Sequence, residues 1–335
     1  MNNAKKIWLI VAASLVVIGL LTVVVVMSIF GWDFKKLNSV KYETNTHIIS
    51  DEFEKISIDT TTADIVFIPS ADGERRVECC EMKKAKHMVF VEDGALNVKV
   101  EDTRKWYDFL GINFGSAKIT VYMPADEYNS LYINSATGDV EIPNNFSFGS
   151  IDVSVSTGDV RCMASASGEM KIEATTGDIT VGGARAASAS LFVTTGDVKA
   201  SGLAVDGDVI IGVSTGDINL TDVTCKNFVS RGSTGDVTLN RVIANESLSV
   251  HRSTGNVNLD SCDASELYIK TTTGDVLGSL LTEKVFIASA NTGDVDVPKT
   301  VNGGRCEINT TTGDIRITVQ KQNDGTGQAP DSWFN

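Results

Sequence analysis

The most repeated chemical group in the sequence is a carboxylate that follows a Thr-Gly pair. Nine aspartates and one asparagine occupy this position: Asp139, Asp159, Asp178, Asp197, Asp217, Asp236, Asn256, Asp275, Asp294 and Asp314. Carboxylates stacked about 4.8 Å apart repel each other by roughly 1 kcal/mol per pair in water. Such a column could attract calcium, which takes oxygen ligands.

The same residues also suit a purely structural turn. Glycine adopts positive φ without strain, and an aspartate side chain accepts hydrogen bonds from backbone N–H groups. The G-G-x-G-x-D signature of calcium-binding solenoids does not occur in the sequence. We therefore predict that the ten residues form a structural turn ladder and that the protein needs no cofactor, with calcium binding kept as the alternative.

A second group of candidate residues is basic: Arg231, His251, Arg252 and Lys270. Arg231, His251 and Lys270 each stand three residues before a repeated threonine, and Arg252 adjoins His251. The chain has 43 acidic and 29 basic residues and a formal net charge of −14. This balance disfavours nucleic acid as a partner, because phosphate binding depends on Lys and Arg clusters. We predict an anionic-ligand patch for a wall polymer or a lipid headgroup; the alternative is that these residues only offset acidic neighbours.

No group of residues predicts catalysis or a metal site. The three histidines lie far apart in the sequence, and no nucleophile elbow, phosphate loop or zinc-ligand spacing occurs. We therefore expect no enzyme; a polysaccharide-acting β-helix enzyme is the enzymatic alternative. Among the six cysteines, Cys162, Cys262 and Cys306 are expected to be buried thiols, whereas Cys79 and Cys80 could pair with a neighbouring strand.

The elements that position these groups repeat every 19 or 20 residues. The repeated threonines are Thr137, Thr157, Thr176, Thr195, Thr215, Thr234, Thr254, Thr273, Thr292 and Thr312. Apolar residues alternate with polar ones on both sides of each threonine, which is the period of a β-strand. One such unit cannot bury its apolar face, but stacked units can. Residues 128–319 are therefore predicted to form an all-β solenoid of about ten coils; a sandwich or propeller of antiparallel hairpins is the alternative.

Residues 52–127 precede the regular repeat and are predicted to be a β-rich capping region. The expected strands are Ile56–Asp59, Asp64–Ile68, Arg75–Glu81, Met88–Glu92, Leu96–Val100 and Lys118–Met123. The segment Thr62–Ile65 resembles a degenerate first turn, and an insertion is expected around Lys105–Phe114. Residues 320–335 are predicted to be a flexible tail.

An uncharged segment of 24 residues, residues 7–30, is predicted to be a single transmembrane helix. As a helix it is about 36 Å long, which exceeds a hydrocarbon core of about 30 Å. The run is longer than the apolar part of a usual signal peptide, the alternative. Residues 1–6 are expected to be a cytoplasmic tail and residues 31–51 a juxtamembrane linker. The lysines on the two sides nearly balance, so the outward orientation of the β-rich part rests on the short N-terminal tail.

The stretch Val121–Val140, V-Y-M-P-A-D-E-Y-N-S-L-Y-I-N-S-A-T-G-D-V, and the turns that follow it resemble the bacterial putative-adhesin family. This family is a domain-of-unknown-function group of β-strand-repeat surface proteins, often with one N-terminal membrane span. The resemblance covers Glu52–Val319 and implies the fold and a surface location. It implies no catalytic or ligand-binding residue.

Together these observations predict a non-enzymatic, membrane-anchored protein of the bacterial cell envelope. The solenoid is expected to lie outside the cytoplasm as an adhesin-like or scaffold module that contacts a wall polymer, a surface or a membrane protein. The alternative is a sensor or accessory protein of the envelope that binds membrane partners, calcium or an anionic ligand.

Overall fold

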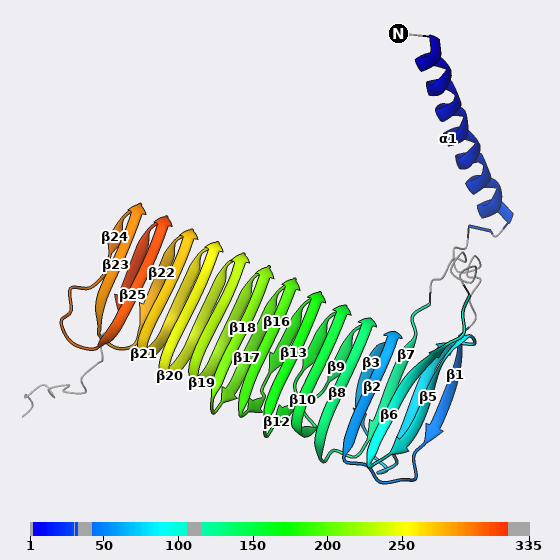
Figure 1. Cartoon of the computed structure of the whole chain (residues 1–335), viewed down its shortest axis with the longest axis horizontal. Helices are drawn as coiled ribbons and strands as arrows, with labels where there is room; N and C mark the ends of the chain where they lie inside the picture. Colours follow the sequence, from blue (N-terminus) through cyan, green and yellow to red (C-terminus); the bar gives the residue numbers. More distant parts are fainter. Residues whose placement is uncertain (1–2, 30, 33–41, 106–114, 321–335) are drawn as a thin grey trace, which may run out of the picture.

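The computed structural model describes residues 3–29, 31–32, 42–105 and 115–320. One helix, α1 (Asn3–Ile29), precedes a rod of β-strands (Figure 1). The helix begins inside the segment expected to be a cytoplasmic tail. The expected tail beyond Gln320 and most of the expected insertion after Lys105 lie outside the described residues.

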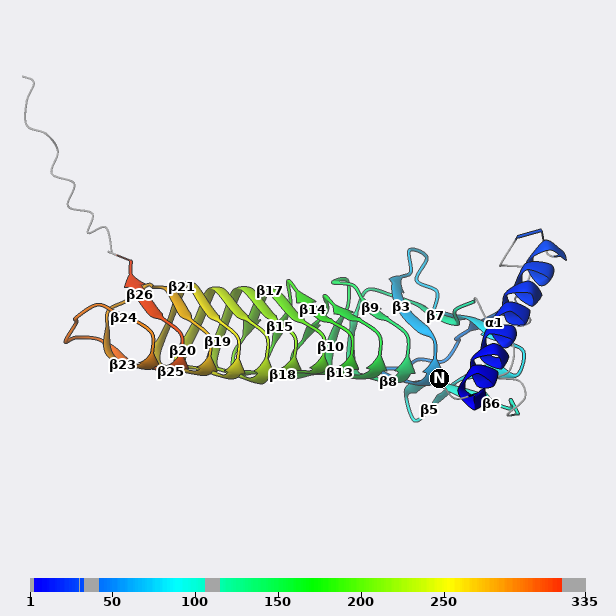
Figure 2. The same ribbon diagram turned by 90° about the horizontal axis from the view of Figure 1, so that it is seen from above.

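The rod is the predicted β-solenoid, and its coils stack with parallel strands (Figure 2). The strands that lead into each turn form one face: β8 (Glu127–Thr137), β10 (Ser147–Thr157), β13 (Glu169–Thr176), β16 (Ser188–Thr195), β18 (Asp208–Thr215), β23 (Lys284–Thr292) and β25 (Gly304–Thr312). Three long strands run from one turn to the next: β19 (Ile218–Thr234), β20 (Val237–Thr254) and β21 (Val257–Thr273). The strands that follow the turns complete the coils: β9 (Val140–Ile142), β11 (Val160–Cys162), β12 (Ser165–Ala166), β14 (Ile179–Gly182), β15 (Arg185–Ala186), β17 (Val198–Val205), β22 (Val276–Leu280), β24 (Val295–Asp296) and β26 (Ile315–Val319).

The repeated threonines pair with one another across neighbouring coils, so every turn lies at the same corner of the rod. Because side chains alternate along a strand, this register places all the apolar columns inside. Val153, Ile172, Leu191 and Ile211, for example, come from four successive coils and are almost fully buried. The core is therefore one continuous column of apolar, mostly aliphatic side chains.

The last two coils do not stack in chain order. Strand β25 pairs with β21 on one side and with β23 on the other. The coil that comes last in the sequence is thus inserted between its two predecessors, and the coil of β23 and β24 forms the end of the rod (Figure 1). The spacing of the repeats gives no sign of this exchange.

The capping region contains the expected strands: β2 (Lys55–Thr62), β3 (Asp64–Pro69), β4 (Arg76–Met82), β5 (Ala85–Glu92), β6 (Ala95–Asp102) and β7 (Lys118–Met123). Strand β2 pairs in parallel with β8, with Thr62 opposite Thr137, so the degenerate first turn joins the solenoid register. A further strand, β1 (Tyr42–Ile48), lies within the segment expected to be a linker and pairs antiparallel with β4. Most residues of β1 are polar, so the sequence shows no apolar alternation that would predict a strand there.

Candidate functional site

The repeated aspartates form a ladder of side-chain to backbone hydrogen bonds. Oδ1 of every residue except Asp294, the last in the stack, accepts the backbone N–H of the equivalent residue in the next coil, at 2.7–3.1 Å. The ladder begins at Asp64 and follows the spatial order of the coils, so that it passes from Asp275 to Asp314 and then to Asp294. The turn corner is therefore held by side chains as well as by the strands.

Asn256 shows which part of the aspartate this ladder uses. Its backbone N–H donates to Asp236 Oδ1, and its own side-chain Oδ1 accepts the N–H of Asp275 at 2.9 Å. An amide oxygen thus replaces a carboxylate oxygen without a break in the ladder. The common requirement is an oxygen acceptor and not a negative charge, which supports the structural interpretation over a calcium column.

Two features of each turn require glycine at this position: the backbone conformation and the close approach of the neighbouring coil. Gly235 has a φ of 123°, a region that side chains disfavour. A Cβ added there would also lie 2.0 Å from the carbonyl oxygen of Gly216 in the neighbouring coil. The coils therefore approach each other too closely at this corner for any side chain on that residue.

The basic residues of the predicted patch divide into two environments. Arg231 pairs with His251 and His251 with Lys270 across three successive coils, and all three side chains are exposed. We call these three residues the basic row. Arg252 does not belong to it, because adjacent residues of a strand face opposite sides, and Arg252 points inward with 0% of its surface exposed.

Arg252 is an unusual residue for the interior of the rod. Its Nη1 donates to the carbonyl oxygen of Val213 at 2.9 Å, whereas Nε and Nη2 find no partner among the described residues. Burial lowers the pKa of the guanidinium, and the negative charge of Asp217 opposes this. The neighbouring coil leaves room for it with Gly232, where a Cβ would collide with the arginine. The sequence contains a signal for this placement. When the repeats are aligned on their threonines, Val213 and Gly232 stand at the same position as Arg252, two residues before the threonine.

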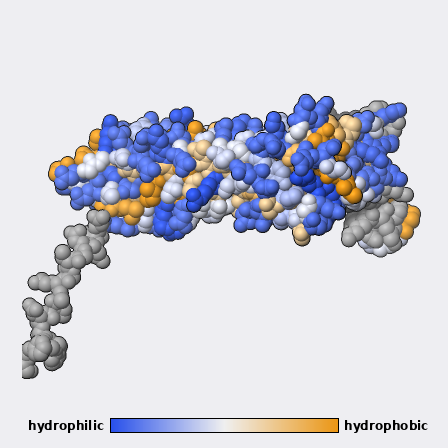
Figure 3. All heavy atoms as spheres, turned by 90° about the horizontal axis from the view of Figure 1, so that it is seen from below, coloured by the Kyte–Doolittle hydropathy of each residue, from blue (hydrophilic) through white to orange (hydrophobic). Residues whose placement is uncertain are grey.

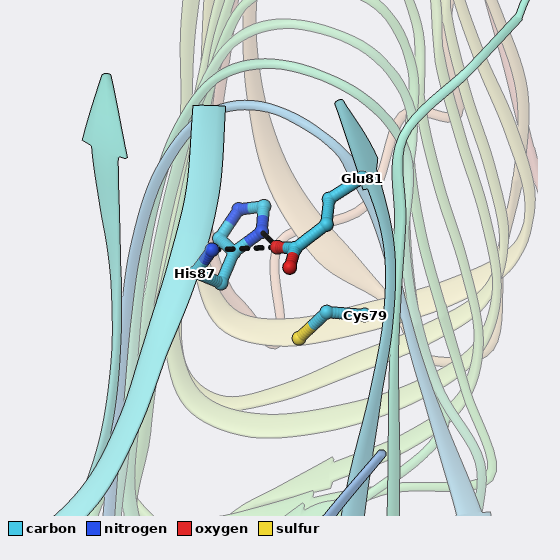
Figure 4. A group of neighbouring side chains, drawn as sticks. All are labelled: Cys79, Glu81 and His87. Atoms are coloured by element: carbon cyan, nitrogen blue, oxygen red, sulfur yellow. Dashed lines mark hydrogen bonds and ion pairs between the residues drawn. The ribbon is translucent and has the colours of Figure 1, made fainter. Parts of the chain in front are cut away.

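A buried polar cluster in the capping region was missed by the sequence analysis. Glu81 on β4 and His87 on β5 are hydrogen-bonded, with 2.8 Å between Glu81 Oε2 and His87 Nδ1 (Figure 4). Asn45 Nδ2 on β1 donates to Glu81 Oε1 at 2.6 Å, and the Thr60 hydroxyl on β2 lies 2.9 Å from His87 Nε2. Four strands of the cap are thus joined through one carboxylate and one imidazole.

Cys79 lies beside this pair on the same inward face of β4 (Figure 4). Its thiol is free, is 0% exposed and has no hydrogen bond with any described residue. Burial, and secondarily the charge of Glu81, raises its thiol pKa to about 12. The six cysteines are all free thiols, as expected for Cys162, Cys262 and Cys306, which are buried in the solenoid.

The cluster has the residue types of a nucleophilic relay, because a hydroxyl, an imidazole and a carboxylate follow one another. However, Thr60 is only 3% exposed, so a substrate cannot reach its hydroxyl in this structure. The sequence signal for the cluster is the alternation along β4: Cys79 and Glu81 stand two and four residues after Val77, so all three side chains face the interior. The partner His87 lies on the next strand and could not be assigned from spacing alone.

Solved structures are similar to the chain over most of its length. No curated protein matches the chain. A putative adhesin from Bacteroides fragilis is 17% identical with a TM-score of 0.44, over 83% of this chain and 97% of that chain. A putative lipid binding protein from Parabacteroides distasonis is 13% identical with a TM-score of 0.45, over 81% of this chain and 98% of that chain.

The family comparison covers more than half of the chain. The model of the Toastrack domain, DUF4097, matches residues 53–212 and 204–328. These ranges contain the capping strands from β2 onward and every coil of the solenoid. The chain therefore belongs to the Toastrack DUF4097 family.

Proposed function

We propose that the protein is a non-enzymatic, single-pass membrane protein of the bacterial cell envelope, with its solenoid outside the cell as an adhesin-like interaction module. The observation that carries this proposal is α1. The most apolar 18-residue window of the segment Lys5–Ile29 has a mean hydropathy of 3.1 and is not buried against the protein. An apolar helix of this length is stable across a lipid bilayer, where its backbone hydrogen bonds are satisfied internally.

The rod supports the role of an interaction module. Its coils present long exposed faces, and the face in Figure 3 is largely hydrophilic, with hydrophobic patches toward both ends. Such a stack holds side chains at a fixed spacing over a long distance, which suits the binding of an extended or repetitive partner.

A cleaved signal sequence has a similar length and position, so the test must show whether α1 remains attached. We expect a C-terminally tagged chain to stay in the membrane after an alkaline carbonate wash, with the mass of the complete chain. Protease added to intact cells whose wall or outer membrane has been removed should cleave off the tag. A shortened, soluble chain would contradict the anchor, and a protected tag would contradict the orientation.

The basic row is the proposed contact for an anionic envelope polymer. Its three side chains project from successive coils, so a polymer with repeated phosphate groups can contact more than one of them, and the acidic remainder of the surface disfavours binding elsewhere. We expect Arg231→Gln, His251→Gln and Lys270→Gln together to weaken the binding of a poly(glycerol phosphate) probe to the complete chain in detergent micelles.

The matched control replaces three exposed basic residues that form no row, Arg161, Arg185 and Lys226, by glutamine. Both triple variants remove basic side chains from an acidic surface, but only the first should lose binding. Equal weakening in the two variants would indicate a nonspecific charge effect and would refute the basic row as a site.

A further inference from the structure

The buried cluster in the cap contains the three ligand types that zinc-class metals prefer. A thiol, a carboxylate and an imidazole are contributed by Cys79, Glu81 and His87, and their ligand atoms all lie within 4.8 Å of one another. All three residues are buried, with 0%, 1% and 5% of their surface exposed. Cys79 and Glu81 stand two residues apart on β4, and His87 lies across the hairpin on β5 (Figure 4).

The surrounding hydrogen bonds are those that hold metal ligands in place. A ligating histidine usually donates its second ring N–H to a polar neighbour, and ligating carboxylates are themselves hydrogen-bonded. Here the Thr60 hydroxyl lies next to His87 Nε2, and Asn45 holds Glu81 Oε1. His87 Nδ1 faces Glu81 Oε2, which also accepts the His87 backbone N–H, and the free Cys79 thiol lies beside them.

The charge balance of the cluster also accommodates a divalent cation. Without a metal, Glu81 contacts His87, and the Cys79 thiol lies beside them as a free, buried group. A divalent ion with one thiolate and one carboxylate gives a neutral group, and a coordinating thiol loses its proton to the solvent. The soft sulfur ligand selects against calcium and magnesium, which take oxygen ligands.

We propose that Cys79, Glu81 and His87 bind one divalent transition-metal ion of the zinc class. Binding replaces the proton between His87 Nδ1 and Glu81 Oε2 and the proton of the Cys79 thiol. The ion joins β4 to β5 near the start of the solenoid, so it stabilises the cap that precedes the first coil. Because a metal that binds only the folded state adds its binding free energy to stability, the site links metal supply to the integrity of the cap.

The experiment uses the complete chain in detergent, reduced and freed of metal, and titrates it with Co²⁺ as a coloured substitute for zinc. We expect about one equivalent of Co²⁺ to give a thiolate-to-metal charge-transfer band, and Zn²⁺ to abolish it by competition. Zn²⁺ should also raise the midpoint of thermal unfolding.

Two ligand variants and one control assign the site. Cys79→Ser should lose the band, and His87→Gln should weaken binding by more than about 10-fold. Cys80→Ser should keep both the band and the affinity, because Cys80 is the next residue and faces the other side of β4. The wild-type titration decides the matter even where a variant folds poorly: a missing band overturns the proposal, as does a band that persists in Cys79→Ser.

Discussion

The solenoid and the cap use polar side chains in opposite ways. In the solenoid, the polar groups of the ladder lie at a surface corner, where Oδ1 of one residue accepts one backbone N–H from the next coil. In the cap, Glu81 is buried and accepts from three donors on β1 and β5: Asn45 Nδ2, His87 Nδ1 and the His87 backbone N–H. Because the ladder repeats the same bond many times, the loss of one bond should cost little stability. The loss of a residue from the buried cluster should cost more, because a buried polar neighbour then lacks a hydrogen-bond partner. This difference predicts the size of the effect of each substitution.

The largest effect is expected at Glu81. Glu81→Ala leaves the buried donors of His87 without their acceptor, and the loss of one partner from a buried pair costs about 3–5 kcal/mol. The measurement is the free energy of unfolding in metal-free buffer. Glu78→Ala is the control, because Glu78 faces the other side of β4 and is partly exposed. A similar cost at the two positions would contradict the special role of the buried cluster.

The next largest loss of stability is expected at the glycine of the turn, which no other residue type can replace. Gly235→Ala combines a disfavoured φ with a collision against the backbone of Gly216, and we expect a loss of about 3 kcal/mol. Gly183→Ala is the control, because Gly183 also has a positive φ but no atom near the added Cβ, so its cost should be about 1 kcal/mol. Denaturant unfolding of the two variants checks the difference. Equal losses would show that close packing at the corner contributes nothing.

Arg252 breaks the pattern of the solenoid, because it is a buried polar residue in the repetitive part. Arg252→Met removes two unsatisfied donors and keeps the volume, so we expect stability to rise by about 1–3 kcal/mol despite the lost bond to Val213. The exposed Arg231→Met is the control and should change stability little. A lower unfolding midpoint for Arg252→Met would mean that the guanidinium makes a stabilising contact after all.

A small effect is expected at the ladder itself. Asp217→Asn keeps the Oδ1 acceptor for the Asp236 N–H, as Asn256 does in its own coil, and should cost less than about 0.5 kcal/mol. Asp217→Ala removes the acceptor and should cost about 1 kcal/mol. Thermal unfolding with calcium and with chelator at matched ionic strength should give equal midpoints. A calcium-dependent rise that Asp217→Asn abolishes would revive the metal column.

The smallest effect is the loss of folding stability at low pH that the Asp178 carboxyl contributes. The backbone N–H of Asp197, and then the Lys199 ammonium, hold the pKa of the Asp178 carboxyl below its usual value, although burial opposes them. A carboxyl whose pKa is lower in the folded state stabilises the protein above its unfolded pKa, about 3.9, and this contribution is lost as the pH falls through the folded pKa. Unfolding at pH 7 and pH 3 should therefore show a slightly smaller acid loss for Asp178→Asn than for wild type. An equal loss would show that the carboxylate charge is irrelevant.

Much of the fold was predictable because periodicity reports which side of a strand faces the core. The strands of the cap from β2 onward, the turn at Thr62–Asp64 and the buried thiols all followed from local alternation. The inward position of Arg252 was also predictable, because Val213 and Val193 stand at the same position of their own repeats, two residues before the threonine.

By itself, the sequence determined the repeat, the turn corner and the apolar helix, because each depends on residues close together in the chain. Only the tertiary structure decided that β25 inserts between β21 and β23, because both stacking orders satisfy the same register. Only it brought Cys79, Glu81 and His87 together with Thr60 and Asn45. Those contacts join strands of a region without a repeat. In such a region, the sequence does not predict which polar residue on another strand a given polar residue will contact.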